Sequence, residues 1–85
     1  MNYEEIIQGC KLGDRKCQNS LVQTVAPRLL AVCKRYCPES NAAEDALQET
    51  FINVFRYIHT FDGRGSFEGW LRRVAVTSCL AVKKK

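Results

Sequence analysis

The sequence predicts an all-α protein, a small bundle of three to four helices. Apolar residues recur at helical spacing along most of the chain, and no segment shows the sustained apolar–polar alternation of a strand. The 85 residues suffice for one domain, and 46% of them are hydrophobic, as in a folded chain. Capping residues, glycines and prolines divide the chain into four stretches with short connections, which favours antiparallel or steeply crossing neighbours.

Capping residues and prolines set the bounds of the first two helices. Asn2 can cap a short helix with an acidic first turn, and a glycine ends that helix. Asp14 can cap a longer second helix, which stops before Pro38. Pro27 lies inside the second helix and removes a backbone hydrogen bond, so we expect a kink or a split there. The apolar positions at helical spacing in this helix are Leu21, Val25, Leu29, Val32, Cys33 and Tyr36.

The third and fourth helices have the clearest apolar stripes. Ser40 or Asn41 can cap the third helix, with Glu44 three or four residues further on, as in a capping box. An Asp-Gly turn follows this helix, and Ser66 can cap the fourth. The stripe of the third helix is Ala43, Leu47, Thr50, Phe51, Val54, Phe55, Ile58 and Phe61. The matching face of the fourth is Phe67, Trp70, Leu71, Val74, Ala75, Ser78 and Cys79.

Charge is unevenly distributed along the chain, although the net charge is only +4. Acidic residues predominate between residues 39 and 62, whereas basic residues predominate between residues 10 and 37 and between residues 63 and 85. The basic segments are compatible with a polyanionic partner, and the acidic segment is compatible with a basic protein surface. The sequence therefore predicts two partners of opposite charge.

The polar face of the third helix is a candidate protein-docking patch. Charged and amide side chains surround one apolar residue, Ile52, and carboxylates there can pair with arginines of a partner. The alternative is a solvated helix face, which charged residues usually form. The members of this face are Asp45, Gln48, Glu49, Ile52, Asn53 and Arg56.

The turn before the fourth helix and the basic face of that helix are candidate nucleic-acid contacts. Aromatic residues near Arg64 offer stacking surfaces for unpaired bases, and the helix N-terminus at Ser66 offers free N–H groups to an anion. Alternatively, Phe61 and Trp70 pack in the core. The basic face can lie along a phosphate backbone, or its final lysines form a solvated helix end. This face comprises Arg72, Arg73, Val76, Thr77, Leu80, Lys83, Lys84 and Lys85.

Residues that often carry chemistry form no catalytic motif here. The one histidine, His59, has no partner motif, no cysteine adjoins a base in sequence, and no phosphate-binding GxxxxGK occurs, so we expect no enzyme and no cofactor. The five cysteines are expected to be reduced and mostly buried, with no metal site; a metal or redox site at Cys33 and Cys37 is a weaker alternative. The acidic N-terminus and the lack of a long apolar stretch predict a cytoplasmic protein without membrane insertion.

Several segments resemble region 2 of the extracytoplasmic-function (ECF) group of bacterial sigma-70 factors. Residues 44–51, EDALQETF, resemble the acidic EDxxQExF helix of that family. Residues 61–71, FDGRGSFEGWL, resemble its FD…SFxxWL element. Upstream, residues 26–29, APRL, and residues 13–21 resemble the APRL and GDxxAFxxL segments. The resemblance covers nearly the whole chain, in order and spacing, and implies the helical fold of sigma region 2.

The resemblance also implies a function in transcription initiation. Region 2 binds the β′ clamp helices of the RNA polymerase core, and it recognises and helps melt the promoter −10 element by capturing the non-template strand. An anti-sigma factor is a further partner that the resemblance implies. The polymerase-binding residues would be Asp45, Gln48, Glu49, Ile52 and Asn53. The DNA-binding residues would be Arg64, Ser66, Phe67, Arg72, Arg73, Val76, Thr77 and Lys83.

The last turns of the fourth helix depart from the family pattern. Val76, Thr77 and Ala81 stand where the family usually has arginine, asparagine and aspartate. These departures favour an alternative function, a helical interaction module that docks on polymerase or an anti-sigma factor without binding DNA. We expect residues 1–85 to be a single region 2 domain excised from a longer sigma factor, without the helix-turn-helix domain that binds the −35 element.

Overall fold

Helices make up most of the chain, and short turns join them. The structure is a computed structural model that describes residues 2–83. Within these residues it contains helices and no strand, which confirms the predicted all-α bundle. The helices are α1 (Tyr3–Lys11), α2 (Arg15–Tyr36), α3 (Ser40–Tyr57), the short 3-10 helix η1 (Ile58–Thr60) and α4 (Phe67–Lys83).

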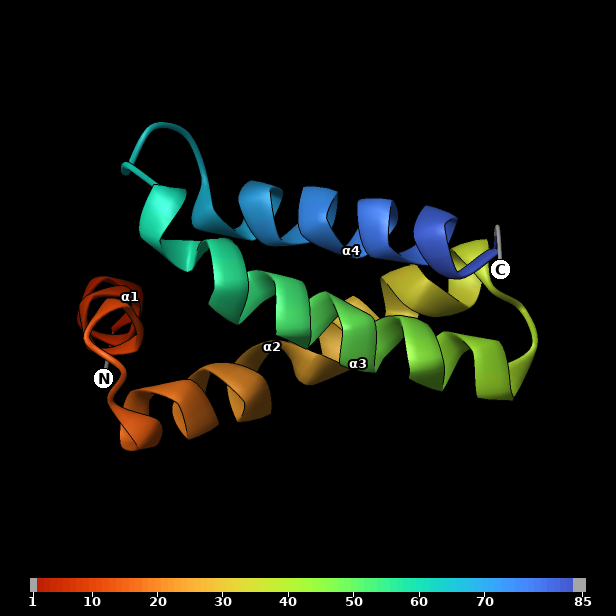
Figure 1. Cartoon of the computed structure of the whole chain (residues 1–85), viewed down its shortest axis with the longest axis horizontal. Helices are drawn as coiled ribbons and strands as arrows, with labels where there is room; N and C mark the ends of the chain where they lie inside the picture. The colour runs from red at the N-terminus through yellow and green to blue at the C-terminus, as the bar shows by residue number, and fades with distance from the viewer. Residues whose placement is uncertain (1, 84–85) are drawn as a thin grey trace.

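Three long helices form the body of the bundle, and α1 lies across one end of it (Figure 1). α3 and α4 are antiparallel neighbours joined through η1 and the loop of residues 61–66, and α2 packs against both. α1 contacts α2 and η1, so it lies at the end of the bundle from which the loop projects. Among the described residues, no helix has the length and apolar character needed to cross a membrane.

Three of the predicted helix starts are confirmed by hydrogen bonds that the capping side chains accept. Asn2 Oδ1 accepts a backbone N–H from the first turn of α1 at 2.9 Å. Asp14 Oδ1 accepts an N–H from the first turn of α2 at 2.8 Å. Ser66 Oγ accepts an N–H from the first turn of α4 at 3.1 Å. Each bond satisfies a donor that the helix itself leaves without a partner.

One predicted helix start is wrong, and of the kink or split predicted at Pro27 the split is absent. α3 begins at Ser40, so its N-cap position is Glu39, and no side chain caps it. The predicted cap at Ser40 or Asn41 is wrong because the Ala43 N–H already donates to the Glu39 carbonyl at 3.0 Å. α2 continues through Pro27 without a split. Pro27 is exposed, so water can satisfy the carbonyl that loses its backbone donor.

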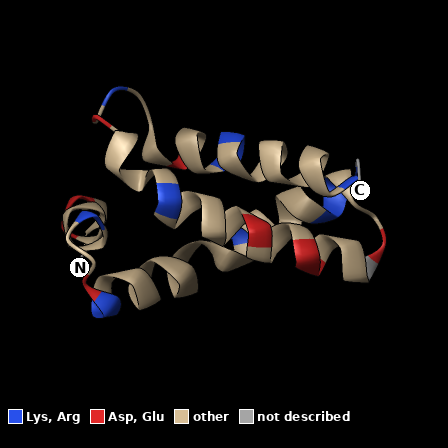
Figure 2. Ribbon diagram, in the orientation of Figure 1, with Lys and Arg blue, Asp and Glu red and all other residues tan. Residues whose placement is uncertain are grey.

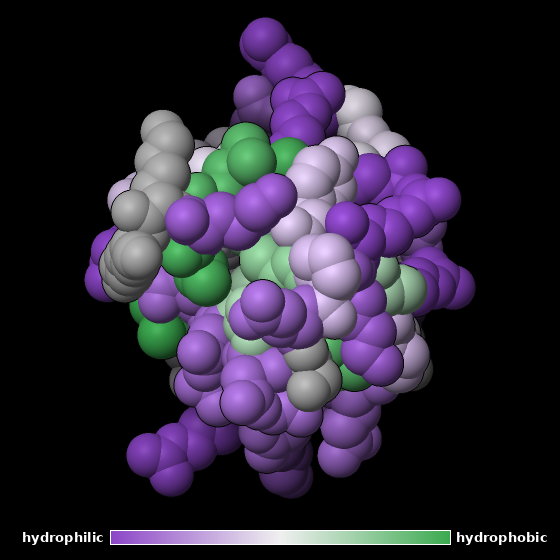
Figure 3. Space-filling model, turned by 90° about the vertical axis from the view of Figure 1, so that its right-hand side faces the viewer, coloured by the Kyte–Doolittle hydropathy of each residue, from purple (hydrophilic) through white to green (hydrophobic). Residues whose placement is uncertain are grey.

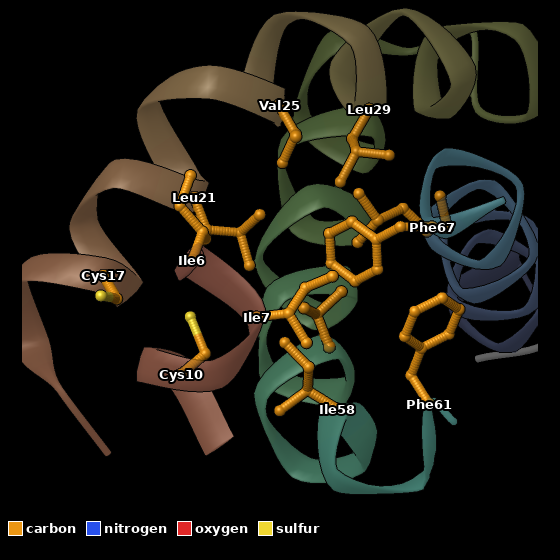
Figure 4. Close-up of a cluster of buried hydrophobic side chains, with 13 residues drawn as sticks. Ile6, Ile7, Cys10, Cys17, Leu21, Val25, Leu29, Ile58, Phe61 and Phe67 are labelled. Carbon is orange, nitrogen blue, oxygen red and sulfur yellow. The ribbon is translucent and has the colours of Figure 1, made fainter. Parts of the chain in front are cut away.

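The two predicted apolar stripes face one another in the main core (Figure 4). On α3 and just beyond it, Val54, Ile58 and Phe61 are buried, and on α4 Phe67 and Leu71 are buried. The stripe predictions are therefore confirmed. The side chains that α1 and α2 add to this cluster are Ile6, Ile7, Cys10, Cys17, Leu21, Val25 and Leu29.

The cysteines are part of the core. Cys33 of α2 and Cys37, which directly follows that helix, pack with Cys79 of α4 in a second cluster. Burial, and then these two neighbours, raise the pKa of Cys79 to about 12. The thiolate form of Cys79, which metal binding or oxidation at this residue would require, is therefore disfavoured at neutral pH. All five cysteines are buried, which confirms their interpretation as core residues.

A small apolar patch lies at the end of the bundle opposite the loop of residues 61–66. Figure 3 looks at this end and shows hydrophobic residues gathered beside hydrophilic ones. A pocket of about 420 Å³ lies here between the α2–α3 turn and the last turn of α4. Its apolar lining is Tyr36, Cys37, Pro38, Ala42 and Val82.

Candidate protein and nucleic-acid interfaces

Four of the five predicted polymerase-binding residues share one surface. Acidic positions lie together on the exposed side of α3 (Figure 2). A shallow groove of about 380 Å³ runs along them and is closed on one side by Val82 of α4. Ile52 keeps 51% of its surface exposed, which is high for a large apolar residue and gives the patch an apolar centre. The α3 patch comprises Asp45, Gln48, Glu49 and Ile52.

Asn53 is the fifth of these residues, and the structure places it elsewhere. Its Nδ2 donates to Ser78 Oγ at 3.0 Å, and that hydroxyl donates to the Val74 carbonyl at 2.8 Å. Asn53 therefore connects α3 to α4. It lines a separate pocket of about 480 Å³, the α3–α4 pocket, whose other walls are Tyr57, Trp70, Arg73, Val74 and Thr77.

The loop of residues 61–66 presents a charged tip on a defined backbone. Gly63 and Gly65 have positive φ angles of 85° and 72°, which other residues adopt only at a cost. Asp62 Oδ1 accepts the Arg64 N–H at 3.0 Å, and its other oxygen lies 3.4 Å from Arg64 Nε. The Arg64 side chain is nevertheless 92% exposed. Its guanidinium is thus available to a ligand.

The aromatic residues on either side of the loop pack against one another. The Phe67 ring centroid lies 5.2 Å from that of Phe61 and 5.7 Å from that of Trp70. The Tyr3 ring meets Phe67 edge-on at 5.6 Å. Phe67, which the resemblance assigns to DNA, is buried in this cluster (Figure 4), and only 7% of its surface is exposed.

A further pocket, the loop pocket, lies between the loop and α1, with a volume of about 380 Å³. Lys11 Nζ donates to the Phe61 carbonyl at 2.8 Å and holds the two walls together. The sequence assigned no residue of the first helix to a site. Glu4, Gln8 and Lys11 all line the pocket, and their i, i+4, i+7 spacing marks them as one helix face. This spacing could have indicated the helix face from the sequence alone. The sequence does not show, however, that this face meets the loop.

Glu68 ties α4 to the first two helices. It accepts the Tyr3 hydroxyl at 3.1 Å and forms an ion pair with Arg28 Nη1. Burial, with Glu68 as the next cause, raises the pKa of Tyr3. These contacts fix the start of α4 beside the loop pocket.

The predicted basic face of α4 is divided between two flanks of the helix. Arg72 lines a groove shared with α2, whereas Arg73 and Thr77 line the α3–α4 pocket. Successive residues of a helix point about 100° apart, so adjacent arginines reach different neighbours. Val76 is partly buried and Lys83 is exposed at the end of α4. Lys84 and Lys85 lie outside the described residues.

Comparison with known proteins identifies the family. The Sigma-70 region 2 family matches residues 21–85. The chain is 32% identical over 75 residues to the ECF RNA polymerase sigma-E factor of Haemophilus influenzae. The matched stretch covers 88% of this chain and 39% of that protein. The chain is 33% identical over 73 residues to the sigma-E factor of Escherichia coli K12, covering 86% of this chain and 38% of that protein. The RNA polymerase sigma-H factor of Pseudomonas aeruginosa is 27% identical over 75 residues, 88% of this chain and 39% of that protein.

A solved structure has the same fold. It is the NMR structure of an engineered region 2 of sigmaE in complex with GTAAAA, which superposes with a TM-score of 0.82 at 29% identity. The match covers 95% of this chain and 88% of that one. This chain belongs to the Sigma-70 region 2 family, and its resemblance to the ECF group is confirmed. It spans 39% or 38% of the length of the sigma-E factors that it matches.

Proposed function

We propose that this chain acts in transcription initiation, in the cytoplasm, by binding the RNA polymerase core and by recognising and helping to melt the promoter −10 element. The observation that supports this most is its likeness to a region 2 of sigmaE whose structure contains the hexamer GTAAAA. The mechanism is binding, without covalent chemistry. The acidic residues on the exposed side of α3 suit a basic protein partner, and the arginines of the loop and of α4 suit a polyanion.

The α3 patch is the proposed site for the β′ clamp helices. Asp45 and Glu49 present carboxylates one helical turn apart, which suits arginines or lysines on a partner helix. The half-exposed Ile52 beside them supplies an apolar contact. An anti-sigma factor that covers this patch would prevent polymerase binding, so we propose it as an alternative partner of the same surface.

The loop pocket is the proposed receptor for one base of the non-template strand. Turning a base out of a duplex costs a few kcal/mol, which contacts in a pocket can offset. Arg64 stands at the loop tip, and Lys11 and Phe67 line the pocket. Ser66 is proposed to contact the non-template DNA strand, although its Oγ already accepts the hydrogen bond that caps α4.

Residues of α4 are proposed to hold the rest of the DNA. Arg72, Arg73 and Lys83 can neutralise phosphates, which adds affinity that falls as salt rises. Thr77 lies in the α3–α4 pocket beside Arg73, where its hydroxyl can reach a base or sugar. Val76 is partly buried and offers only an apolar contact.

Fluorescence anisotropy of a labelled single strand tests the DNA function. The strand contains GTAAAA, and a scrambled strand of the same composition is the comparison. We expect the natural order to bind more tightly, and Arg64→Ala/Arg72→Ala to lose that preference along with roughly tenfold in affinity. The matched control is Lys16→Ala/Lys34→Ala, because both lysines are exposed on α2 and line none of the pockets described above.

If both strands bind equally well, and the arginine variant binds them with the same affinity as the wild type, the proposed DNA function is wrong. That result would leave the alternative of an interaction module that docks on polymerase or an anti-sigma factor. The departures at Val76, Thr77 and Ala81 are the features that favour that alternative.

A further inference from the structure

A groove of about 320 Å³ lies between α2 and α4, on the flank of α4 away from the α3–α4 pocket. Val25, Leu29 and Leu71 close its bottom and are almost fully buried. Ala31 is exposed and Val32 partly exposed, so these two give the groove its accessible apolar surface. The α2–α4 groove therefore has an apolar floor.

Three arginines and one carboxylate, Glu68, form the rim of this groove. Arg28 and Arg35 come from α2 and Arg72 from α4, and all three are exposed. Within residues 2–83 the ion pairs are Arg28–Glu68 and Arg64–Asp62, so the guanidiniums of Arg35 and Arg72 have no carboxylate partner. Guanidinium groups in this situation suit carboxylates, which they bind in pairs of parallel hydrogen bonds.

We propose that the α2–α4 groove docks an acidic amphipathic helix of a partner protein. The α2 side of the groove runs from Val25 to Arg35, about 15 Å of helix, which accommodates two to three turns of a partner. The apolar stripe of such a helix would cover Ala31 and Val32, while its acidic residues would meet Arg35 and Arg72.

Nucleic acid fits this groove less well. None of the residues that line it is aromatic, so unpaired bases have no stacking surface here, in contrast to the α3–α4 pocket with Tyr57 and Trp70. A duplex would touch the arginines through its phosphates and leave the apolar floor uncovered. The combination of apolar floor and arginine rim therefore favours a protein helix.

The proposal goes beyond the proposed function and connects with it at one residue. Arg72 belongs both to the groove rim and to the proposed DNA surface. A helix seated in the groove would take Arg72 away from a phosphate, so it would compete with promoter DNA. The α3 patch and the loop pocket would remain open.

The test uses a fluorescein-labelled synthetic peptide of about four helical turns, with leucine at i, i+3, i+4 and i+7 and glutamate at the flanking positions. A peptide of the same composition in scrambled order and one with lysine in place of glutamate are the comparisons. We expect only the acidic amphipathic peptide to bind. In ¹⁵N-edited NMR spectra it should shift the amides of residues 25–35 and 68–72.

Arg35→Glu should weaken this binding by roughly tenfold, and Lys34→Glu should leave it unchanged. The two variants make the same charge change on neighbouring residues, but only Arg35 lines the groove. Arg35 is also outside the proposed DNA set, so Arg35→Glu should preserve the preference for the GTAAAA strand, which separates this inference from the proposed function. Equal effects of the two variants, or amide shifts confined to other surfaces, would overturn the inference.

Discussion

At Asn53, one hydrogen bond favours a role in helix packing over the predicted role in docking. The helical pattern places it on the polar face of α3 beside Ile52, where a docking role is the natural prediction. Its amide instead donates to the buried Ser78 hydroxyl. That contact makes it a part of the α3–α4 packing, a role that no pattern within one helix can reveal.

Exchanging Asn53 should therefore affect stability more than polymerase binding. We expect Asn53→Ala to lower the free energy of unfolding by about 1 kcal/mol, because Ser78 Oγ loses a donor in a partly buried setting. Urea unfolding measures this. The matched comparison is Asp45→Lys, which should abolish pull-down of the β′ clamp-helix segment and leave stability nearly unchanged. A pull-down defect in Asn53→Ala at normal stability would return Asn53 to the polymerase surface.

Arg73 offers a second prediction for a single residue. Its guanidinium stands in the α3–α4 pocket beside Thr77, so we expect Arg73→Ala to weaken binding of the GTAAAA strand at low salt. The slope of log affinity against log salt should become shallower by roughly one counterion. Titrations at several salt concentrations measure the slope. A slope equal to that of the wild type would remove Arg73 from the phosphate contacts.

The elements of this bundle follow closely from their sequences, whereas their mutual arrangement does not. The stripes on α3 and α4 predict the core because helical spacing fixes which residues share a face. The caps at Asn2, Asp14 and Ser66 follow from side-chain chemistry that acts within one turn. The loop pocket depends on α1 crossing the bundle beside residues 61–66, and no local signal encodes a crossing. The division of Arg72 and Arg73 between two flanks has the same origin.

The contact between α1 and α2 is tight at Gly9. A Cβ on Gly9 would lie 2.1 Å from Cys17 Sγ and 2.7 Å from Cys17 Cβ. We expect Gly9→Ala to destabilise the protein by about 1–3 kcal/mol through this overpacking, as thermal or urea unfolding would show. Cys17→Ala should recover part of the loss in the double variant, because it removes the nearer atom. Full stability of Gly9→Ala would mean that α1 can shift freely against α2.

At the scale of the whole molecule, the buried thiols make stability depend on alkaline pH. Burial raises the pKa of Cys10 to about 11 and that of Cys79 to about 12. Unfolding lowers these pKa values toward the ordinary value of about 8.5. The unfolded chain therefore loses protons that the folded chain keeps once the pH exceeds about 8.5, and ionisation favours the unfolded state.

The free energy of unfolding should thus be constant with respect to these thiols below about pH 8 and fall as the pH rises toward 10. Cys10 and Cys79 each add up to about 1.4 kcal/mol of loss per pH unit in that range. Urea unfolding between pH 7 and pH 10 measures the decline, and Cys79→Ala should show a smaller one. At pH 8 the folded protein should also react slowly with a thiol reagent, and all five cysteines should react after denaturation. An identical pH profile in the Cys79 variant would contradict this explanation.

The hydrogen bond from Lys11 to the Phe61 carbonyl joins two segments that are far apart in the sequence, and these two segments form the walls of the loop pocket. The helix that closes the pocket lies outside residues 21–85, the stretch that matches the family. If the loop pocket receives a promoter base, as proposed above, substitutions in residues 3–11 should change the base preference while the loop stays as it is. Chimaeras that exchange residues 3–11 between relatives can be tested for their affinity to DNA strands that differ in a single base. The result would show whether base preference follows the exchanged helix. Under the proposed function, α1 would then be a second place, outside residues 21–85, at which base preference can differ between relatives.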